Sequence, residues 1–241
     1  MKLICYLSNG FPTIEESVKI AEYYVTGGCD AIEIDLPSKN PYLESDYISN
    51  RVATALAACD DYDRYMENII QIKHRLPDTE IILLSYENTV KEIGVQKFID
   101  FCLANDLKDI IFVGLENENI KNLLIDNGIK VSCYVQFNMI PEEIDSAKAS
   151  NGFVYMQAKT IPEKINPRFP TLADCIKYLR AQGIERKIYC GVGIYEPSDF
   201  KMVKDAKGDG AFVGSTILKL CKNPEKLMAT IASFKAVDKL K

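Results

Sequence analysis

Short runs of apolar and β-branched residues alternate with longer segments of helical periodicity from one end of the chain to the other. Such alternation is typical of parallel strands that are joined by crossover helices. In the first helical segment, Thr13 followed by Glu16 resembles a capping box, and Gly27 and Gly28 mark the helix end. The apolar runs predict strands near residues 3–7, 31–35, 80–84, 109–114, 131–136, 153–158, 187–192 and 210–214. Helical segments are expected at 13–28, 88–106, 171–183, 196–208 and 224–234.

The domain organisation follows from the same pattern. Among the 241 residues there is no Pro/Ser/Gly-rich linker and no block of like charge at which two domains would separate. About eight rounds of strand and helix in this length predict an α/β protein with one (β/α)8 barrel of the TIM type, spanning residues 1–241. An open, doubly wound sheet remains the structural alternative.

Two long insertions interrupt the even spacing of the strands. Residues 36–64 follow the second strand, and residues 159–171 follow the sixth. Both insertions begin at the carboxyl end of a strand, which is the rim where barrel enzymes place their active sites. Functional residues are therefore expected there.

The charge of the chain excludes some classes of function. A formal net charge of −5 with no basic stripe argues against nucleic acid binding, because too few cations are grouped to displace counterions from phosphates. No apolar run approaches the roughly 18 residues needed to span a bilayer, and the opening MKLICYLSNG becomes polar too early for a signal peptide. We therefore expect a cytoplasmic protein that does not contact membranes.

Cysteine and histidine content narrows the chemistry further. The eight cysteines form no CxxC pair and several lie in strand-like runs, so they are interpreted as reduced, mostly buried thiols. The one histidine, His74, lies in a polar segment and is interpreted as a surface residue. A metal site, and catalysis by a Ser-His or Cys-His pair, are therefore not expected.

Glu33 is the main candidate for chemistry, since it lies between Ile32 and Ile34 in the second predicted strand. Alternate residues of a barrel strand face the lumen and the helices, so Glu33 would face away from its two neighbours. A carboxylate in a partly dry lumen has a raised pKa suited to proton transfer near neutral pH. A structural ion pair with a lysine is the other interpretation.

Other candidates lie on the loops of the same rim. Glu44, eleven residues after Glu33, would either reach across the pocket or be a solvated loop acid. Residues 191–194 (GVGI) and 214–216 (GST) follow the last two strands, where glycine-rich loops often hold a phosphate with backbone N–H groups; tight turns are the alternative. Tyr155 and Phe112 would line the lumen if they face inward, although strand aromatics are more often core.

Taken together, these residues resemble the α subunit of tryptophan synthase. The similarity runs from CYLSNGFPT and DAIEIDLPSKNPYLESD through LLSYENTV to GVGIYEPSDF and GAFVGSTIL, nearly end to end. Its most specific part is the Glu33 strand followed by Pro37 and Pro41 at the spacing of the family.

The resemblance implies an activity. The family is a β/α barrel that cleaves indole-3-glycerol phosphate to indole and glyceraldehyde 3-phosphate in tryptophan biosynthesis, a carbon-carbon lyase reaction. Glu33 matches the catalytic glutamate, which protonates indole C3 and takes the proton of the glycerol hydroxyl, and Glu44 matches an aspartate that stabilises the indole N–H. The resemblance assigns substrate binding to the positions Tyr155, Gly193, Gly214 and Ser215, with the last three as backbone donors to the phosphate.

The resemblance also implies a partner. Tyr86 and Asn88 match residues that face the β subunit in the family, and Pro37 and Pro41 are assigned to the same interface. An α2β2 assembly is expected, in which pyridoxal phosphate belongs to the β subunit and the chain itself carries no cofactor.

Three departures from the family pattern leave other functions open. Glu44 is one methylene longer than the family aspartate, Lys159 replaces an arginine at the start of a loop without glycine, and Leu115 replaces an aspartate that helps to couple the subunits. One alternative is a barrel enzyme that acts on another phosphorylated substrate. The other is a non-catalytic partner of a β subunit.

Overall fold

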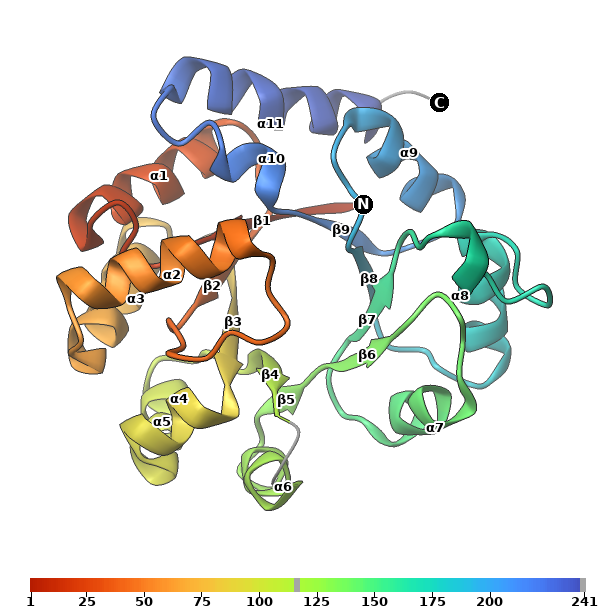
Figure 1. Ribbon diagram of the computed structural model, residues 1–241, viewed down its shortest axis with the longest axis horizontal. Coiled ribbons are helices and arrows are strands. Elements are labelled where there is room, and N and C mark those ends of the chain that lie inside the picture. Colours follow the sequence, from red (N-terminus) through yellow and green to blue (C-terminus); the bar gives the residue numbers. More distant parts are fainter. Residues whose placement is uncertain (115–117, 239–241) are drawn as a thin grey trace.

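The chain folds as one barrel of parallel strands surrounded by helices (Figure 1). The computed structural model describes residues 1–114 and 118–238. The strands follow one another in the sheet in the order β5-β4-β3-β2-β1-β9-β8-β7-β6, and every pairing is parallel. The predicted (β/α)8 barrel is therefore confirmed.

The strands are β1 (Lys2–Leu7), β2 (Ala31–Asp35), β3 (Glu80–Tyr86), β4 (Asp109–Val113), β5 (Lys130–Val131), β6 (Cys133–Val135), β7 (Val154–Gln157), β8 (Ile188–Gly191) and β9 (Gly210–Val213). The α-helices are α1 (Ile14–Thr26), α2 (Asp46–Ala58), α3 (Tyr62–Arg75), α4 (Glu87–Ile93), α5 (Val95–Ala104), α6 (Glu118–Asp126), α7 (Pro141–Ala149), α8 (Leu172–Ala181), α9 (Pro197–Asp205), α10 (Ser215–Leu218) and α11 (Pro224–Asp238). A 3₁₀ turn, η1, covers Pro162–Lys164.

One predicted strand is divided in two. The run near 131–136 forms β5, which pairs with β4, and β6, which pairs with β7. Ser132 separates the two pieces and donates its backbone N–H to the carbonyl of Ile110 at 2.9 Å. The chain changes neighbours at this residue, so the two ends of the strand order meet within one stretch of backbone and the barrel closes.

The apolar side chains separate into an outer core and a lumen. The outer core, between sheet and helices, holds Ile32 and Ile34, whereas Ala31 belongs to a smaller inner cluster with Ile4 and Phe212. Because strand residues alternate between faces, Glu33 lies on the lumen side with Ala31. The predicted orientation of Glu33 is confirmed.

Helix boundaries follow local signals. Thr13 caps α1 by accepting a hydrogen bond from the N–H of Glu16 at 3.2 Å, and Thr171 forms a capping box with Asp174 at the start of α8. The single helix expected at 88–106 is wrong: Gly94, with φ of 95°, ends α4 and begins α5. A left-handed glycine breaks the helical hydrogen-bond ladder and turns the chain.

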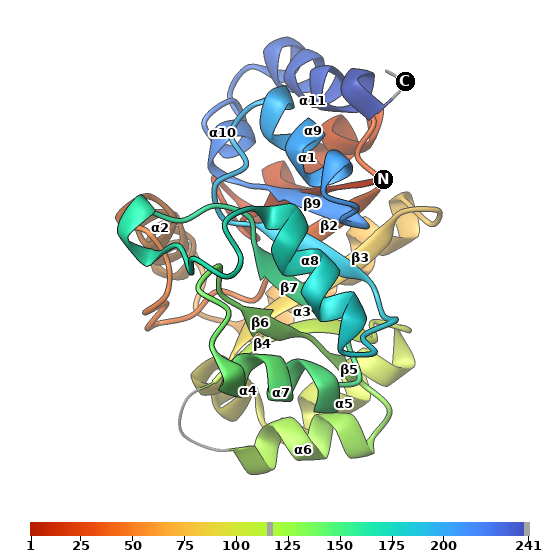
Figure 2. The ribbon, with the colours of Figure 1, turned by 90° about the vertical axis from the view of Figure 1, so that its right-hand side faces the viewer.

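Seen from the side, α2 and α10 lie at the end of the barrel where the strands finish, opposite the amino terminus (Figure 2). The insertion that precedes α2 thus stands over the lumen, as the sequence predicts. No helix in the described part of the chain is long and apolar enough to cross a membrane.

Candidate active site

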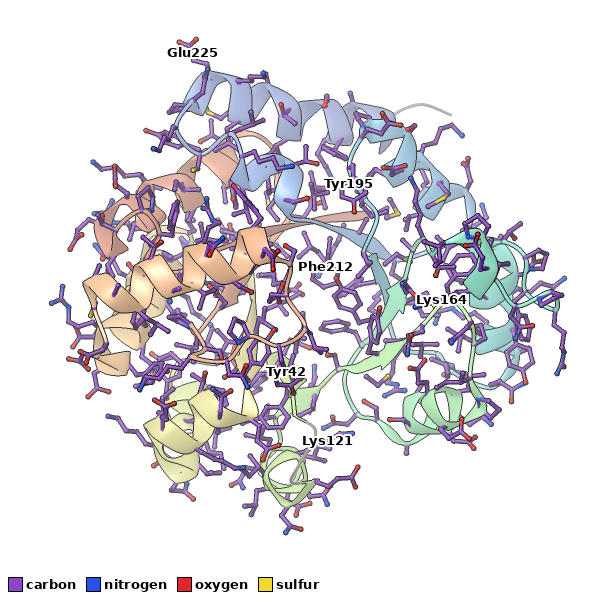
Figure 3. The ribbon with its side chains drawn as sticks, in the orientation of Figure 1. Tyr42, Lys121, Lys164, Tyr195, Phe212 and Glu225 are labelled. Atoms are coloured by element: carbon purple, nitrogen blue, oxygen red, sulfur yellow. The ribbon has the colours of Figure 1, made fainter. Side chains whose placement is uncertain are left out.

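A cavity of about 320 Å³ opens at the carboxyl end of the strands. It is bounded by β1, β2, β3, β7 and β9, by the insertion after β2 and by the loops after β8 and β9. Figure 3 shows the barrel mouth, with Phe212 between the labelled Tyr42 and Tyr195. The lining residues are Tyr6, Glu33, Leu43, Glu44, Ser45, Ile48, Leu84, Tyr155, Val192, Gly193, Ile194, Tyr195, Phe212, Gly214 and Ser215.

Glu33 lies at the floor of this cavity with 7% of its surface exposed. Among the described residues its carboxylate has no hydrogen-bond or ion-pair partner, which removes the structural ion pair as an explanation. Burial, followed by the charges of Glu44 and Asp35, raises the pKa of Glu33 well above its ordinary value. The Glu33 carboxyl therefore holds its proton more tightly than an ordinary glutamate does, which suits a group that donates a proton to a ligand.

Asp35 is a second buried acid that sequence reasoning missed. It lies two residues after Glu33. The Tyr6 hydroxyl donates to the Asp35 carboxylate at 3.0 Å, and the backbone N–H of Asn9 donates to it at 2.6 Å. Burial raises the pKa of Asp35 to about 7, although these two hydrogen bonds act in the opposite direction. The period-2 alternation that places Glu33 on the lumen face places Asp35 there too, so the signal was present in the sequence.

Glu44 reaches back over the cavity from the insertion. The hydroxyl of Tyr86, at the end of β3, donates to its Oε1 at 3.2 Å, and its backbone N–H donates to the carbonyl of Pro41 at 3.0 Å. Burial raises the pKa of Glu44, while the Tyr86 hydrogen bond lowers it. Glu44 is thus a positioned acid of the cavity, and the alternative of a solvated loop acid is wrong.

The two glycine-rich turns face the acids across the cavity. Gly193 follows β8 with φ of 97°, and Gly214 and Ser215 follow β9. Within the described chain, the backbone N–H groups of these three residues donate to no acceptor. Val192 adopts φ of 62°, which is unfavourable for a β-branched residue and strains this turn. The turns present free donors at one end of the cavity.

Tyr155 forms an aromatic wall. Its ring stacks on Phe212 with centroids 4.5 Å apart and planes at 15°. A Cβ atom on Gly191 would lie 2.0 Å from the Tyr155 hydroxyl, so glycine at that position makes room for the ring. The predicted lumen position of Tyr155 is confirmed.

Phe112 is not part of this wall. It packs against the outer core, whereas Ile111 and Val113 of the same strand contact the lumen clusters. The expectation that Phe112 lines the lumen is therefore wrong, because the apolar run of β4 lies in the opposite register to the one assumed. Phe112 does not contact the cavity.

The residues assigned to a partner interface have internal contacts in this chain. Tyr86 is buried beneath Tyr42, whose ring meets it edge-on at 5.5 Å. Asn88 accepts a hydrogen bond from the Ser38 hydroxyl at 3.1 Å, and the carbonyl of Pro37 accepts one from Thr89. Their contact with a partner stays a prediction, as does that of Pro41. Leu115 lies outside the described residues.

The loop after β7 is held from two sides. Lys159 forms an ion pair with Asp199, which also accepts the N–H groups of Tyr195 and Glu196 at 2.8 and 3.1 Å. Further along, the Asn166 amide donates to the carbonyl of Asn138 at 2.9 Å. Lys159 therefore ties the loop after β7 to the turn after β8. Within the described residues, no group of three or more His, Cys, Asp or Glu side chains is placed to hold a metal ion.

Comparison with known proteins agrees with this geometry. The family model described as tryptophan synthase alpha chain matches residues 1–240. Curated alpha chains from Thermosynechococcus vestitus and Aliivibrio fischeri are 25% and 26% identical, over 96% and 95% of this chain and 88% of each relative.

Solved structures share the fold. A chain from Aquifex aeolicus VF5 superposes with a TM-score of 0.86 at 21% identity, covering 98% of this chain and 92% of that one. Tryptophan synthase from M. tuberculosis in an aminoacrylate-bound form gives 0.81 at 22% identity over 98% and 92%. The family model covers almost the whole chain, and the resemblance found in the sequence is confirmed. The chain belongs to the tryptophan synthase alpha chain family.

Proposed function

We propose that this chain is a lyase that cleaves indole-3-glycerol phosphate into indole and glyceraldehyde 3-phosphate. The observation that carries the proposal is a buried Glu33 with a raised pKa that shares one cavity with free backbone donors at Gly193, Gly214 and Ser215. An acid and an anion site at opposite ends of a cavity fit a ligand with a phosphate at one end and a reacting ring at the other.

The chemistry requires one group that first donates and then accepts a proton. Glu33, protonated, gives its proton to C3 of the indole ring, which leaves a positive charge on the ring nitrogen. The resulting carboxylate takes the proton of the glycerol hydroxyl, the bond between C3 and the glycerol carbon breaks, and its electron pair restores the indole while the hydroxyl carbon becomes an aldehyde. A raised pKa suits both steps near neutral pH.

Glu44 has the role of stabilising the ring N–H as positive charge develops. Tyr86 holds one carboxylate oxygen of Glu44, so the other oxygen is available to a ligand. The stacked Tyr155 and Phe212 rings supply a flat apolar wall for an indole. The reaction needs no cofactor bound to this chain.

A β subunit that carries pyridoxal phosphate is the proposed partner, in an α2β2 assembly. Large apolar side chains are exposed around the cavity mouth: Tyr42, Leu43, Ile161 and Tyr195 are 40%, 67%, 55% and 59% exposed. Exposed apolar side chains that gather at one rim favour a protein contact there. Addition of a β subunit is expected to increase indole release, and co-elution of the two chains measures the assembly.

The decisive experiment is Glu33→Gln. The amide keeps the size of the side chain but neither donates nor accepts the proton in the required way, so indole release from indole-3-glycerol phosphate should fall by about 100-fold or more. Affinity for glycerol 3-phosphate, measured by calorimetry, should change by less than about threefold because the glycine turns are untouched.

Glu80→Gln is the matched control. Glu80 lies at the start of β3, at the opposite end of the barrel from the cavity, and forms an ion pair with Lys2. Turnover by Glu80→Gln should therefore stay near that of the wild type. If Glu33→Gln released indole at the normal rate, Glu33 would not be the acid and the proposal would be wrong.

A further inference from the structure

A second cavity of about 380 Å³ lies beside the catalytic cavity, along α2 and α10. Ile48 of α2 and Ser215 of α10 face the catalytic cavity, whereas Arg51 and Lys219, about one turn further along, face the second one. Residues three or four apart lie on the same side of a helix, so one side of each helix lines both cavities, and the second cavity lies about one turn further along. Figure 2 shows α2 and α10 at this end of the barrel.

Arg51 is the central residue of the second cavity. It is only 6% exposed, and its guanidinium carbon lies 3.8 Å from the centre of the Phe11 ring. One terminal nitrogen donates to the Tyr47 hydroxyl at 3.3 Å. Among the described residues, the one further hydrogen-bond partner of the terminal nitrogens is the Cys221 sulfur, at 3.9 and 4.0 Å. The buried Nε has no hydrogen-bond partner in the described part of the chain. Nowhere in the described chain does a carboxylate pair with Arg51.

Two more cations lie beside Arg51. Lys219 and Lys222 line the same cavity, and the Lys219 ammonium lies 5.8 Å from the centre of the Tyr47 ring. Neither lysine forms an ion pair with the described residues. The described lining includes neither Asp nor Glu. Three cations without an acid are unexpected in a chain of net charge −5, where acids outnumber bases.

A buried guanidinium without a counter-ion is costly, and contacts with aromatic rings offset only part of that cost. An arginine fork matches the oxygens of phosphate in a bidentate manner, and lysines add charge around the same anion. We propose that this cavity is a binding site for a small oxyanion of the phosphate class, either free phosphate or the head of a phosphate monoester. Its volume leaves room for the organic part of a small ester beside the anion.

Cys221 provides a local reporter, since it is half-buried and touches Arg51. The experiment follows alkylation of Cys221 by neutral iodoacetamide, read by peptide mass spectrometry, as inorganic phosphate is added at constant ionic strength. Cys59, which is also half-buried but lies at the end of α2 away from Arg51, is the internal control. Phosphate should slow alkylation of Cys221 several-fold and leave Cys59 unaffected.

Variants separate this site from the catalytic cavity. Arg51→Gln should weaken the protection by about tenfold or more, because a charge-assisted hydrogen bond is lost. Lys222→Gln, at an exposed position that leaves the fold intact, should weaken it about twofold to fivefold. Lys226→Gln removes the same charge four residues further along the chain, in α11 and outside the cavity, and should keep wild-type protection. Gly193→Ala, which alters the turn after β8, should also keep it.

Repeating the alkylation with glycerol 3-phosphate shows which anion the site prefers. If glycerol 3-phosphate protects Cys221 at a lower concentration than inorganic phosphate does, the ligand is a phosphate ester. Equal or weaker protection indicates free phosphate. The proposal is overturned if phosphate leaves Cys221 alkylation unchanged. It is equally overturned if protection survives in Lys222→Gln and in folded Arg51→Gln but disappears in Gly193→Ala, because the anion would then act from the catalytic cavity.

Discussion

Replacing Asp35 by asparagine should change how the stability of the chain depends on pH. The Asp35 carboxyl is buried with two donors, and its pKa is raised from 3.8 to about 7. A raised pKa means that the folded state holds the proton more tightly than the unfolded state does. The contribution of Asp35 to stability is therefore highest below about pH 4, falls as pH rises through the window up to about 7, and is level above it. Asp35→Asn removes this pH-dependent loss of stability, because asparagine does not titrate.

The magnitude follows from the pKa. Each pKa unit corresponds to about 1.4 kcal/mol, so the wild type loses at most about 4 kcal/mol of unfolding free energy across the window through this group. The variant keeps the hydrogen-bond geometry, since the amide oxygen can accept from the Asn9 N–H and the amide nitrogen can donate to the Tyr6 hydroxyl. Coupling to Glu33, whose pKa is raised in part by Asp35, shares some of this energy.

The assay is urea unfolding of both proteins between pH 4 and pH 8. The stability of Asp35→Asn relative to the wild type should increase by about 2 to 4 kcal/mol from the acid to the alkaline end. Asp60→Asn, which removes an exposed carboxylate from the segment before α3, controls for the loss of one negative charge. A difference between variant and wild type that stays constant over this range would refute the assignment of a raised pKa to Asp35.

Two further substitutions test the walls of the catalytic cavity. Tyr86→Phe removes the hydrogen bond that lowers the pKa of Glu44. The pKa of Glu44 should therefore rise and the unfolding free energy should fall by about 1 kcal/mol. Carboxyl NMR titration and urea unfolding measure the two effects, and an unchanged Glu44 titration would contradict the contact. Gly191→Ala places a Cβ atom 2.0 Å from the Tyr155 hydroxyl, so the unfolding free energy should fall by about 1 to 3 kcal/mol and binding of indolyl ligands should weaken. Adding Tyr155→Phe should recover part of both losses, whereas no recovery would place the clash elsewhere.

The alternation of apolar and polar residues was sufficient to predict the barrel and the direction of Glu33. It was not sufficient for β4, because DIIFVG is apolar at successive positions and does not reveal which parity faces the lumen. Phe112 was misplaced for this reason. In β2 the flanking isoleucines define the outer face, so the lumen orientation of Glu33 was predicted correctly.

Other features depend on contacts that only the folded chain creates. Asp35 could be placed on the lumen face from its spacing, but its donors come from Tyr6 on β1 and Asn9 after β1, far away in the sequence. Arg51 lies in the insertion after the second predicted strand, and its contacts with Phe11 and Cys221 come from two segments that are distant in the sequence. The division of the fifth strand at Ser132 depends on a change of neighbours that a single apolar run does not encode.

The longer second acid is explained by the way it is held. A glutamate at position 44 has one more rotatable bond than an aspartate, which would leave its carboxylate poorly fixed on a loop. Tyr86 at the end of β3 donates to that carboxylate, and the Tyr42 ring packs edge-on against Tyr86, so the acid is attached to the rigid sheet rather than to the loop alone. The Glu44 charge in turn helps to raise the pKa of Glu33. The extra methylene therefore gives Glu44 the reach to bond a strand residue and still act on the acid at the cavity floor.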